Sequence, residues 1–138
     1  MEKEKLKTGT TIVGVVGKDC IILGADKRVT LAGRIVVDKR FNKILQVNEN
    51  ILVAMSGSVS DAQLLTKYLR ANLKLNELRR NRRNDVKESV NFLSNVIYGS
   101  ARQYIPAIVG FLVAGRDEKG VHLYEVGIDG SIIEYEDY

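Results

Sequence analysis

The sequence predicts an α+β fold in which antiparallel sheets are layered with helices. Segments of strand length fill the first part of the chain, two amphipathic segments of helix length follow, and three more strand segments come last. Strands and helices that are segregated in this way are typical of antiparallel sheets rather than of βαβ winding. A length of 138 residues, 45% of them apolar and 28% charged, fits a single globular domain.

The strands before the helices are predicted as hairpins. Residues 10–16 are mostly β-branched, and the turn Gly17–Asp19 separates them from the continuous apolar run Cys20–Ala25. Because no polar residue interrupts this run, we expect a strand buried on both faces, with Cys20 as an inert core thiol. The same signals predict three more strands, at 35–37, 43–47 and 51–55.

The first helix is predicted from Ala62 to about Leu78. Ser58 or Ser60 can cap it, and the arginines of 79–83 follow its end, where the helix dipole favours cations. Its apolar residues cover a wide stripe, which is typical of a helix packed against a large surface. These residues are Leu64, Leu65, Tyr68, Leu69, Ala71, Leu73, Leu75 and Leu78.

A second amphipathic helix and three strands complete the expected fold. The spacing of Asp85 and Glu88 resembles a capping box, and apolar residues recur at helical spacing from Val86 to Ala101 before Pro106 ends the region. The last strands are predicted at 107–115, 121–126 and 131–134.

Composition and residue counts argue against several classes of function. The net charge of +4 does not by itself call for a nucleic-acid partner, and no apolar stretch is long enough to span a membrane. The single cysteine, Cys20, fits a reducing compartment, and the leader 1–9 lacks the apolar segment of a secretory signal. His122 is the only histidine, so a solvent-facing or satisfied strand histidine is expected rather than a metal site, and the same count argues against a Ser-His-Asp triad.

The four arginines between 79 and 83 form the densest charge cluster and leave three interpretations open. A solvated helix end is the simplest interpretation, and a docking surface for a partner is the second. An Arg-rich RNA-binding module is the remote one, because no aromatic residue lies among the arginines to stack on bases.

The pair Gly9–Thr10 can be interpreted in two ways. Thr10 either opens a strand or, after cleavage behind Gly9, becomes a chain-terminal nucleophile whose own α-amine is the base. Such a site also needs a cation, a carboxylate that fixes it and an oxyanion donor. Lys43, Asp26 and the backbone N–H at the turn 56–57 are candidates, although these residue types are common.

Several stretches together resemble a known family. They are "GTTIVGVVGKD", "ADKRVT", "FNKI", "MSGSVSDAQLL", "LSNVIYGS" and "LVAGRDEKGVHLYEVGIDGS", in this order and over nearly the whole chain. In these motifs the chain is similar to proteasome β subunits, and to the archaeal type most of all. The resemblance implies an N-terminal-nucleophile hydrolase fold, a four-layer αββα sandwich of antiparallel sheets.

The resemblance also implies site residues. Residues 1–9 correspond to a propeptide removed by self-cleavage between Gly9 and Thr10, and residues 10–138 to the hydrolase domain. Thr10 would then be the nucleophile, Lys43 would favour its ionised hydroxyl, Asp26 would keep Lys43 charged, and Gly57 would supply the oxyanion N–H. Substrate-binding positions implied in the same way are Thr30 for the substrate backbone and Val29, Phe41, Leu45, Met55 and Val59 for an apolar specificity pocket.

The function implied is that of a cytoplasmic threonine endopeptidase without cofactor. It would degrade unfolded polypeptide after large apolar residues, inside stacked heptameric rings of α and β subunits that a regulatory ATPase serves indirectly. With its leader in place this form is expected to be a zymogen. The family's domain continues beyond the point matching residue 138, with further Ser and Asp residues that support the nucleophile. The expectations for this chain are therefore a fragment of an active subunit, a subunit completed by a second polypeptide, or a noncatalytic structural subunit.

Overall fold

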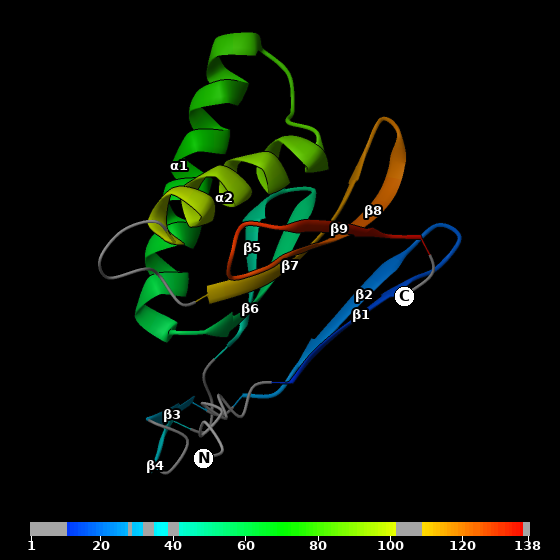
Figure 1. The fold of residues 1–138 in the computed structure, drawn as a ribbon. Helices are drawn as coiled ribbons and strands as arrows, with labels where there is room; N and C mark the ends of the chain where they lie inside the picture. The colour runs from blue at the N-terminus through cyan, green and yellow to red at the C-terminus, as the bar shows by residue number, and fades with distance from the viewer. Residues whose placement is uncertain (1–10, 28, 32–34, 39–41, 102–108, 137–138) are drawn as a thin grey trace.

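A computed structural model of the chain describes residues 11–27, 29–31, 35–38, 42–101 and 109–136 (Figure 1). The helices in these ranges are α1 (Val59–Arg80) and α2 (Val86–Ala101). The strands are β1 (Ile12–Val16), β2 (Ile21–Ala25), β3 (Val29–Leu31), β4 (Ile35–Asp38), β5 (Ile44–Asn48), β6 (Ile51–Gly57), β7 (Val109–Asp117), β8 (Gly120–Val126) and β9 (Ile132–Tyr135).

Five strands form the main sheet in the order β5-β6-β7-β8-β9, with every neighbouring pair antiparallel. β7 is the central strand, and its pairing with β6 runs from Gly115 opposite Ile51 to Val109 opposite Gly57. Because α1 and α2 lie between β6 and β7 in the sequence, this pairing joins the two ends of the helical segment. The strand pairs β1-β2 and β3-β4 form two separate small sheets.

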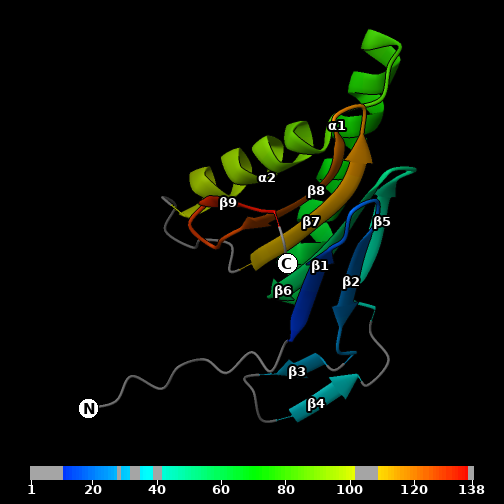
Figure 2. The ribbon, with the colours of Figure 1, turned by 90° about the vertical axis from the view of Figure 1, so that its right-hand side faces the viewer.

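Both helices cover one face of the main sheet (Figures 1 and 2). Successive side chains of a strand point to opposite faces, so alternate residues of β6, β7 and β8 pack against the helices. The buried core between sheet and helices includes Val53, Met55, Leu65, Leu69, Leu73, Val90, Leu93, Ile97, Phe111, Val113, Tyr124 and Val126.

The β1-β2 hairpin packs on the other face of the main sheet (Figure 2). This face carries the intervening residues of the same strands, among them the buried Ala54, Ala114 and Leu123. Gly14 of β1 lies directly over Leu123: a Cβ at this position would be 2.9 Å from Leu123 Cδ2. The absence of a side chain at Gly14 therefore lets the two sheets approach closely.

The predicted fold class is confirmed as α+β with antiparallel sheets. The described residues contain a helical layer, the main sheet and the β1-β2 hairpin stacked in that order. These correspond to three layers of the expected αββα sandwich. Neither described helix is both long enough and apolar enough to cross a membrane.

Two expectations for the first hairpin are wrong. Cys20 is exposed rather than buried, and Ile22 in β2 is 64% exposed. Along β1 and β2, half-buried positions alternate with exposed ones. One face of the hairpin packs on the main sheet, and no element among the described residues covers the other face. The unbroken apolar run therefore did not indicate burial on both faces.

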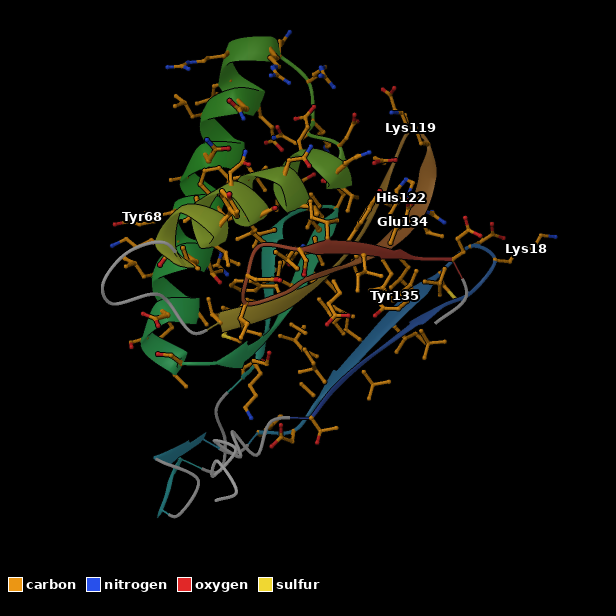
Figure 3. The ribbon with its side chains drawn as sticks, in the orientation of Figure 1. Lys18, Tyr68, Lys119, His122, Glu134 and Tyr135 are labelled. Carbon is orange, nitrogen blue, oxygen red and sulfur yellow. The ribbon has the colours of Figure 1, made fainter. Side chains whose placement is uncertain are left out.

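The first helix is longer than predicted and buries only part of its apolar stripe. Its N-cap is Ser58, whose hydroxyl accepts a hydrogen bond from the Asp61 amide at 3.4 Å. Leu65, Leu69 and Leu73 are buried against the sheet. The remaining apolar residues are exposed on the opposite side of the helix, and Figure 3 shows Tyr68 pointing away from the protein. This outer stripe consists of Leu64, Tyr68, Ala71, Leu75 and Leu78.

The start of α2 is held by a group that the sequence did not suggest. The Glu88 amide donates to the backbone carbonyl of Asp85 at 3.2 Å, instead of to a side chain as in a capping box. The amide of Val86, the first helical residue, donates to the carboxylate of Asp117 at 3.0 Å. A residue at the end of β7 therefore caps the helix from 31 positions away.

Candidate active site

The structure brings Asp26 and Lys43 together. Asp26 follows the last residue of β2, Lys43 precedes the first residue of β5, and Lys43 Nζ lies 2.9 Å from Asp26 Oδ1. The Lys43 side chain is only 4% exposed, whereas that of Asp26 is 30% exposed. A buried ammonium is costly unless a carboxylate and further hydrogen bonds compensate it, so this pair holds a cation at a fixed place.

The Asp26 carboxylate also binds the backbone of Thr11, the residue that follows the predicted nucleophile. The Thr11 amide donates to Asp26 Oδ1 at 3.1 Å, and the Asp26 amide donates to the Thr11 carbonyl at 3.1 Å. Thr11 is covalently joined to Thr10, and this peptide nitrogen and Lys43 Nζ share one acceptor atom. Thr10 itself and Gly9 lie outside the described residues.

Gly57, the expected oxyanion donor, is the last residue of β6 and not part of a turn. It pairs with Val109 and has a φ of 97°, a conformation that glycine adopts without a steric penalty. Ser58, the N-cap of α1, follows it directly. The backbone therefore passes from strand to helix within one residue of the expected donor.

The expected specificity-pocket residues fall into two groups. Register places Leu45 opposite Val53, and a hydrogen bond from the Met55 amide to the Lys43 carbonyl at 2.9 Å extends the same ladder. Leu45 and Met55 thus point to the sheet face under α1, where Met55 belongs to the core and Leu45 packs against it. The Lys43 side chain instead ends at Asp26, which follows β2 of the hairpin. Val59 is the first residue of α1.

The other expected substrate-binding residues are less fully described. The backbones of Val29 and Thr30 belong to β3, which pairs with β4 around a register shift. Phe41 lies outside the described residues. The roles implied for these positions remain predictions.

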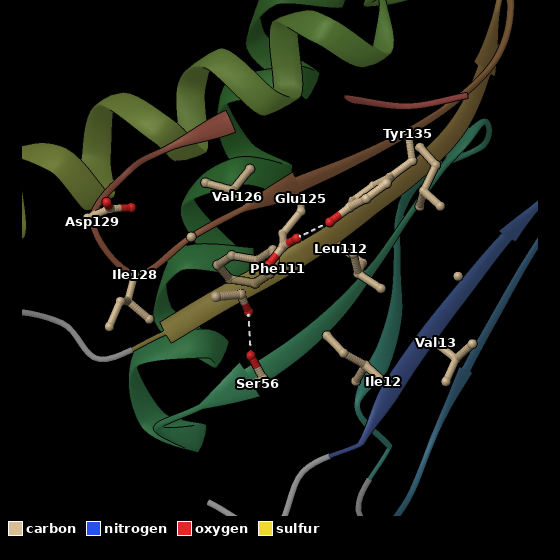
Figure 4. A pocket seen from close by; sticks show the side chains of 14 residues that line it. Ile12, Val13, Ser56, Phe111, Leu112, Glu125, Val126, Ile128, Asp129 and Tyr135 are labelled. Atoms are coloured by element: carbon tan, nitrogen blue, oxygen red, sulfur yellow. Dashed lines mark hydrogen bonds between the residues drawn. The ribbon is translucent and has the colours of Figure 1, made fainter. Parts of the chain in front are cut away.

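A large cavity of about 820 Å³ lies elsewhere, between β1 and the main sheet (Figure 4). Apolar side chains from both sheets line most of it, together with a Glu125–Tyr135 pair in which the tyrosine hydroxyl donates to the carboxylate. This hydrogen bond raises the pKa of Tyr135 above its ordinary value. None of Asp26, Lys43 or Gly57 lines the cavity, so its size does not mark the candidate site.

Asn42, next to Lys43, is a polar residue that the sequence interpretation did not single out. Its side-chain Oδ1 accepts a hydrogen bond from the Ile44 amide at 3.1 Å. An asparagine directly before a strand is a common turn signal, and this signal could have drawn attention to it.

His122, set aside as a satisfied or solvent-facing strand histidine, has a defined partner. Its Nε2 lies 2.9 Å from Asp117 Oδ1, and its Nδ1 lies 3.7 Å from Glu134 Oε1 (Figure 3). This cluster lies on β7, β8 and β9 and includes the carboxylate that caps α2.

The stacked antiparallel sheets under a helical layer are those of an N-terminal-nucleophile hydrolase fold. Residues 6–138 match the family model described as "Proteasome subunit". The chain is 36% identical over 137 residues to "Proteasome subunit beta" of Methanopyrus kandleri, covering 99% of this chain and 64% of that protein. It is 40% identical over 131 residues to "Proteasome subunit beta 1" of Thermococcus onnurineus, covering 95% and 62%.

A eukaryotic protein is similar as well. "Probable proteasome subunit beta type-2" of Schizosaccharomyces pombe is 39% identical over 125 residues, with coverage of 90% of this chain and 45% of that protein. The chain therefore belongs to the proteasome subunit family. It spans less than two thirds of the length of these relatives.

Proposed function

We propose that this chain is a β-type subunit of a proteasome core particle and that Thr10 is its nucleophile. The Asp26–Lys43 pair carries the proposal: a buried ammonium is held 2.9 Å from a carboxylate that also binds the amide next to Thr10. A fixed cation beside a threonine at a new chain start is what a weak hydroxyl nucleophile requires.

The first reaction proposed is removal of the leader. Thr10 Oγ attacks the carbonyl carbon of Gly9, and the Gly9–Thr10 C–N bond breaks as the acyl group moves from nitrogen to oxygen. Water then hydrolyses this ester. The products are a nine-residue leader ending in a carboxylate and a free α-amine on Thr10, whose pKa range makes it a usable base near neutral pH.

Peptide hydrolysis uses the same groups. The α-amine accepts the proton of Thr10 Oγ, which attacks the substrate carbonyl, while the Gly57 N–H stabilises the oxyanion and Lys43 the developing alkoxide. The substrate C–N bond breaks, the proton passes to the leaving amine, and water hydrolyses the acyl-enzyme. The apolar positions Leu45 and Met55 favour large apolar side chains on the substrate.

The surface of α1 supports assembly with other subunits. The outer stripe leaves four large side chains 46–71% exposed on one helix face, namely Leu64, Tyr68, Leu75 and Leu78. Apolar patches of this kind mark protein–protein contacts. The partners proposed are proteasome α subunits and further β subunits in stacked heptameric rings, in the cytoplasm, with unfolded polypeptide as substrate and a regulatory ATPase as an indirect partner.

Intact mass after co-expression with a matching α subunit tests the activity. We expect loss of the first nine residues, which leaves Thr10 as the new N-terminus, and retention of the leader in Thr10→Ala. The same measurement on any longer reading frame shows whether this chain needs residues beyond 138. An assembled protein that keeps its leader in both forms contradicts the proposed nucleophile.

A structural subunit without activity of its own is the second candidate, because the outer stripe serves assembly whether or not Thr10 reacts. The two candidates differ in one measurement. If a reconstituted particle retains its full peptidase activity with Thr10→Ala, the structural role holds and the catalytic one fails.

A further inference from the structure

Lys43 is the central residue of a small turn that its neighbour closes. Asn42 Oδ1 accepts the Ile44 amide at 3.1 Å, so the asparagine side chain spans Lys43 and mimics a backbone turn. On the other side, the Lys43 carbonyl accepts the Met55 amide at 2.9 Å. The backbone of Lys43 is therefore fixed both before and after the point where its side chain leaves it.

The ladder explains why a side chain has to accept the Ile44 amide. In an antiparallel pair, N–H and C=O groups of successive residues point alternately toward the partner strand and away from it. Since Lys43 bonds to β6, the Ile44 amide points away from β6. Among the described strands β5 is an edge strand with β6 as its neighbour, so no strand there receives this amide. Asn42 replaces the missing strand at this one position.

We propose that Asn42 is a positioning residue for Lys43. The turn sets the direction in which the lysine side chain leaves the edge of the sheet. Along this direction the side chain is only 4% exposed and its Nζ lies 2.9 Å from Asp26 Oδ1. Asn42 acts only through Lys43. Its effect on catalysis rests on the proposed function, but its effect on Lys43 does not.

Reaction of Lys43 with an amine-modifying reagent tests the positioning without using activity. The assembled protein is treated with formaldehyde and cyanoborohydride, and mass spectrometry of proteolytic peptides gives the methylation rate of Lys43 relative to Lys18. Lys18 is exposed and lies in the β1-β2 turn, far from the site (Figure 3). A single hydrogen bond is worth enough to change local opening by about 3- to 10-fold, so Asn42→Ala is expected to raise the ratio by this factor.

Two further variants separate the turn from a general loss of polarity. Asn42→Gln keeps the amide but adds a methylene, so it loses the turn and should behave like Asn42→Ala. Asn42→Asp keeps the acceptor at the same distance and should stay within about twofold of the unmodified protein.

The chain contains a matched control at the other end of the same strand. Asn48 Oδ1 accepts the Asn50 amide at 3.0 Å, an equivalent turn that does not involve Lys43. Asn48→Ala should leave the Lys43 ratio unchanged. A Lys43 ratio that stays at the unmodified value in Asn42→Ala, or that rises equally in Asn48→Ala, overturns the proposal.

Leader removal gives the second readout. Asn42→Ala and Asn42→Gln should slow it by about 3- to 10-fold, with Asn42→Asp restoring it. If the unmodified protein never loses its leader, the proposed function fails while the methylation result still decides the role of Asn42. If the leader is removed and the methylation ratio does not respond, the positioning role fails alone.

Discussion

Replacing Asp117 with alanine is expected to loosen the junction between α2 and the main sheet. Three donors converge on this carboxylate: the Val86 amide at 3.0 Å, the Lys119 amide at 2.9 Å and His122 Nε2 at 2.9 Å. The Asp117 side chain is only 6% exposed, so water has little access to these three donors when the carboxylate is removed.

The expected loss follows from these contacts. An unsatisfied buried donor costs about 1–3 kcal/mol, and loss of a helix cap costs about 0.5–2 kcal/mol. The cap and the Val86 amide are the same interaction, so the terms overlap and the free energy of unfolding should fall by about 2–3 kcal/mol. Urea unfolding followed by circular dichroism measures this fall. Asp117→Asn, which keeps an acceptor without the charge, should lose about half as much.

The pH dependence of the free energy of unfolding checks the electrostatic contribution of Asp117. Burial alone would raise the pKa of Asp117, but hydrogen bonds from Val86, Lys119 and His122, with the charge of His122, outweigh it and leave the pKa lowered. A carboxyl with a lowered folded pKa adds stability above its unfolded pKa of about 3.9 and loses it as pH falls through the folded value. The stability difference between the unmodified protein and Asp117→Ala should therefore be full at pH 6 and shrink below about pH 4. An equal difference at pH 6 and pH 3, or no difference at pH 6, refutes this account.

Four other predictions concern packing, assembly and the ion pair. Gly115→Ala places a Cβ 2.6 Å from the Asn50 carbonyl oxygen and should destabilise by about 1–3 kcal/mol in urea unfolding, whereas Gly24→Ala, with open space around it, should be near neutral. Leu69→Ala should cost about 2–5 kcal/mol, but Leu64→Ala on the outer stripe less than about 0.5; equal losses would contradict the two faces assigned to α1. Leu75→Glu should leave the unfolding free energy unchanged yet prevent co-purification with α subunits. Lys43→Ala should abolish leader removal, which intact mass measures. If this variant loses its leader normally, Lys43 does not take part in the reaction.

The parts of the fold that depend on local signals could be predicted from the sequence. Ser58 and the turn residues at 48–50 place the start of α1 and the β5-β6 hairpin, because caps and turns are decided within a few residues. Which apolar residues are buried could not be predicted in the same way. Leu64 and Leu65 are equally apolar, and only the position of the sheet makes one exposed and the other buried.

The candidate site shows the same division. Their residue types alone made Asp26 and Lys43 candidates, and only the resemblance to a family placed them in one site, since their separation in the sequence does not imply contact. Asp117 could not be singled out from the sequence, because nothing within a short window indicates that it caps a helix that starts 31 residues earlier. Asn42 was overlooked because its importance depends on β5 being an edge strand, which is a property of the whole sheet.

The pairing of β6 with β7 has a consequence for the order of folding. Gly57 pairs with Val109 across the whole helical segment that separates them in the sequence. This contact therefore closes a long loop and forms slowly. The β1-β2 hairpin, by contrast, closes through a short turn and can form early. Asp26 follows the strands of this first hairpin, whereas Lys43 precedes β5 of the β5-β6 hairpin, which also closes through a short turn. Their ion pair therefore joins two locally formed hairpins and completes only when these have stacked, so the proposed reaction at Thr10 would wait for that step.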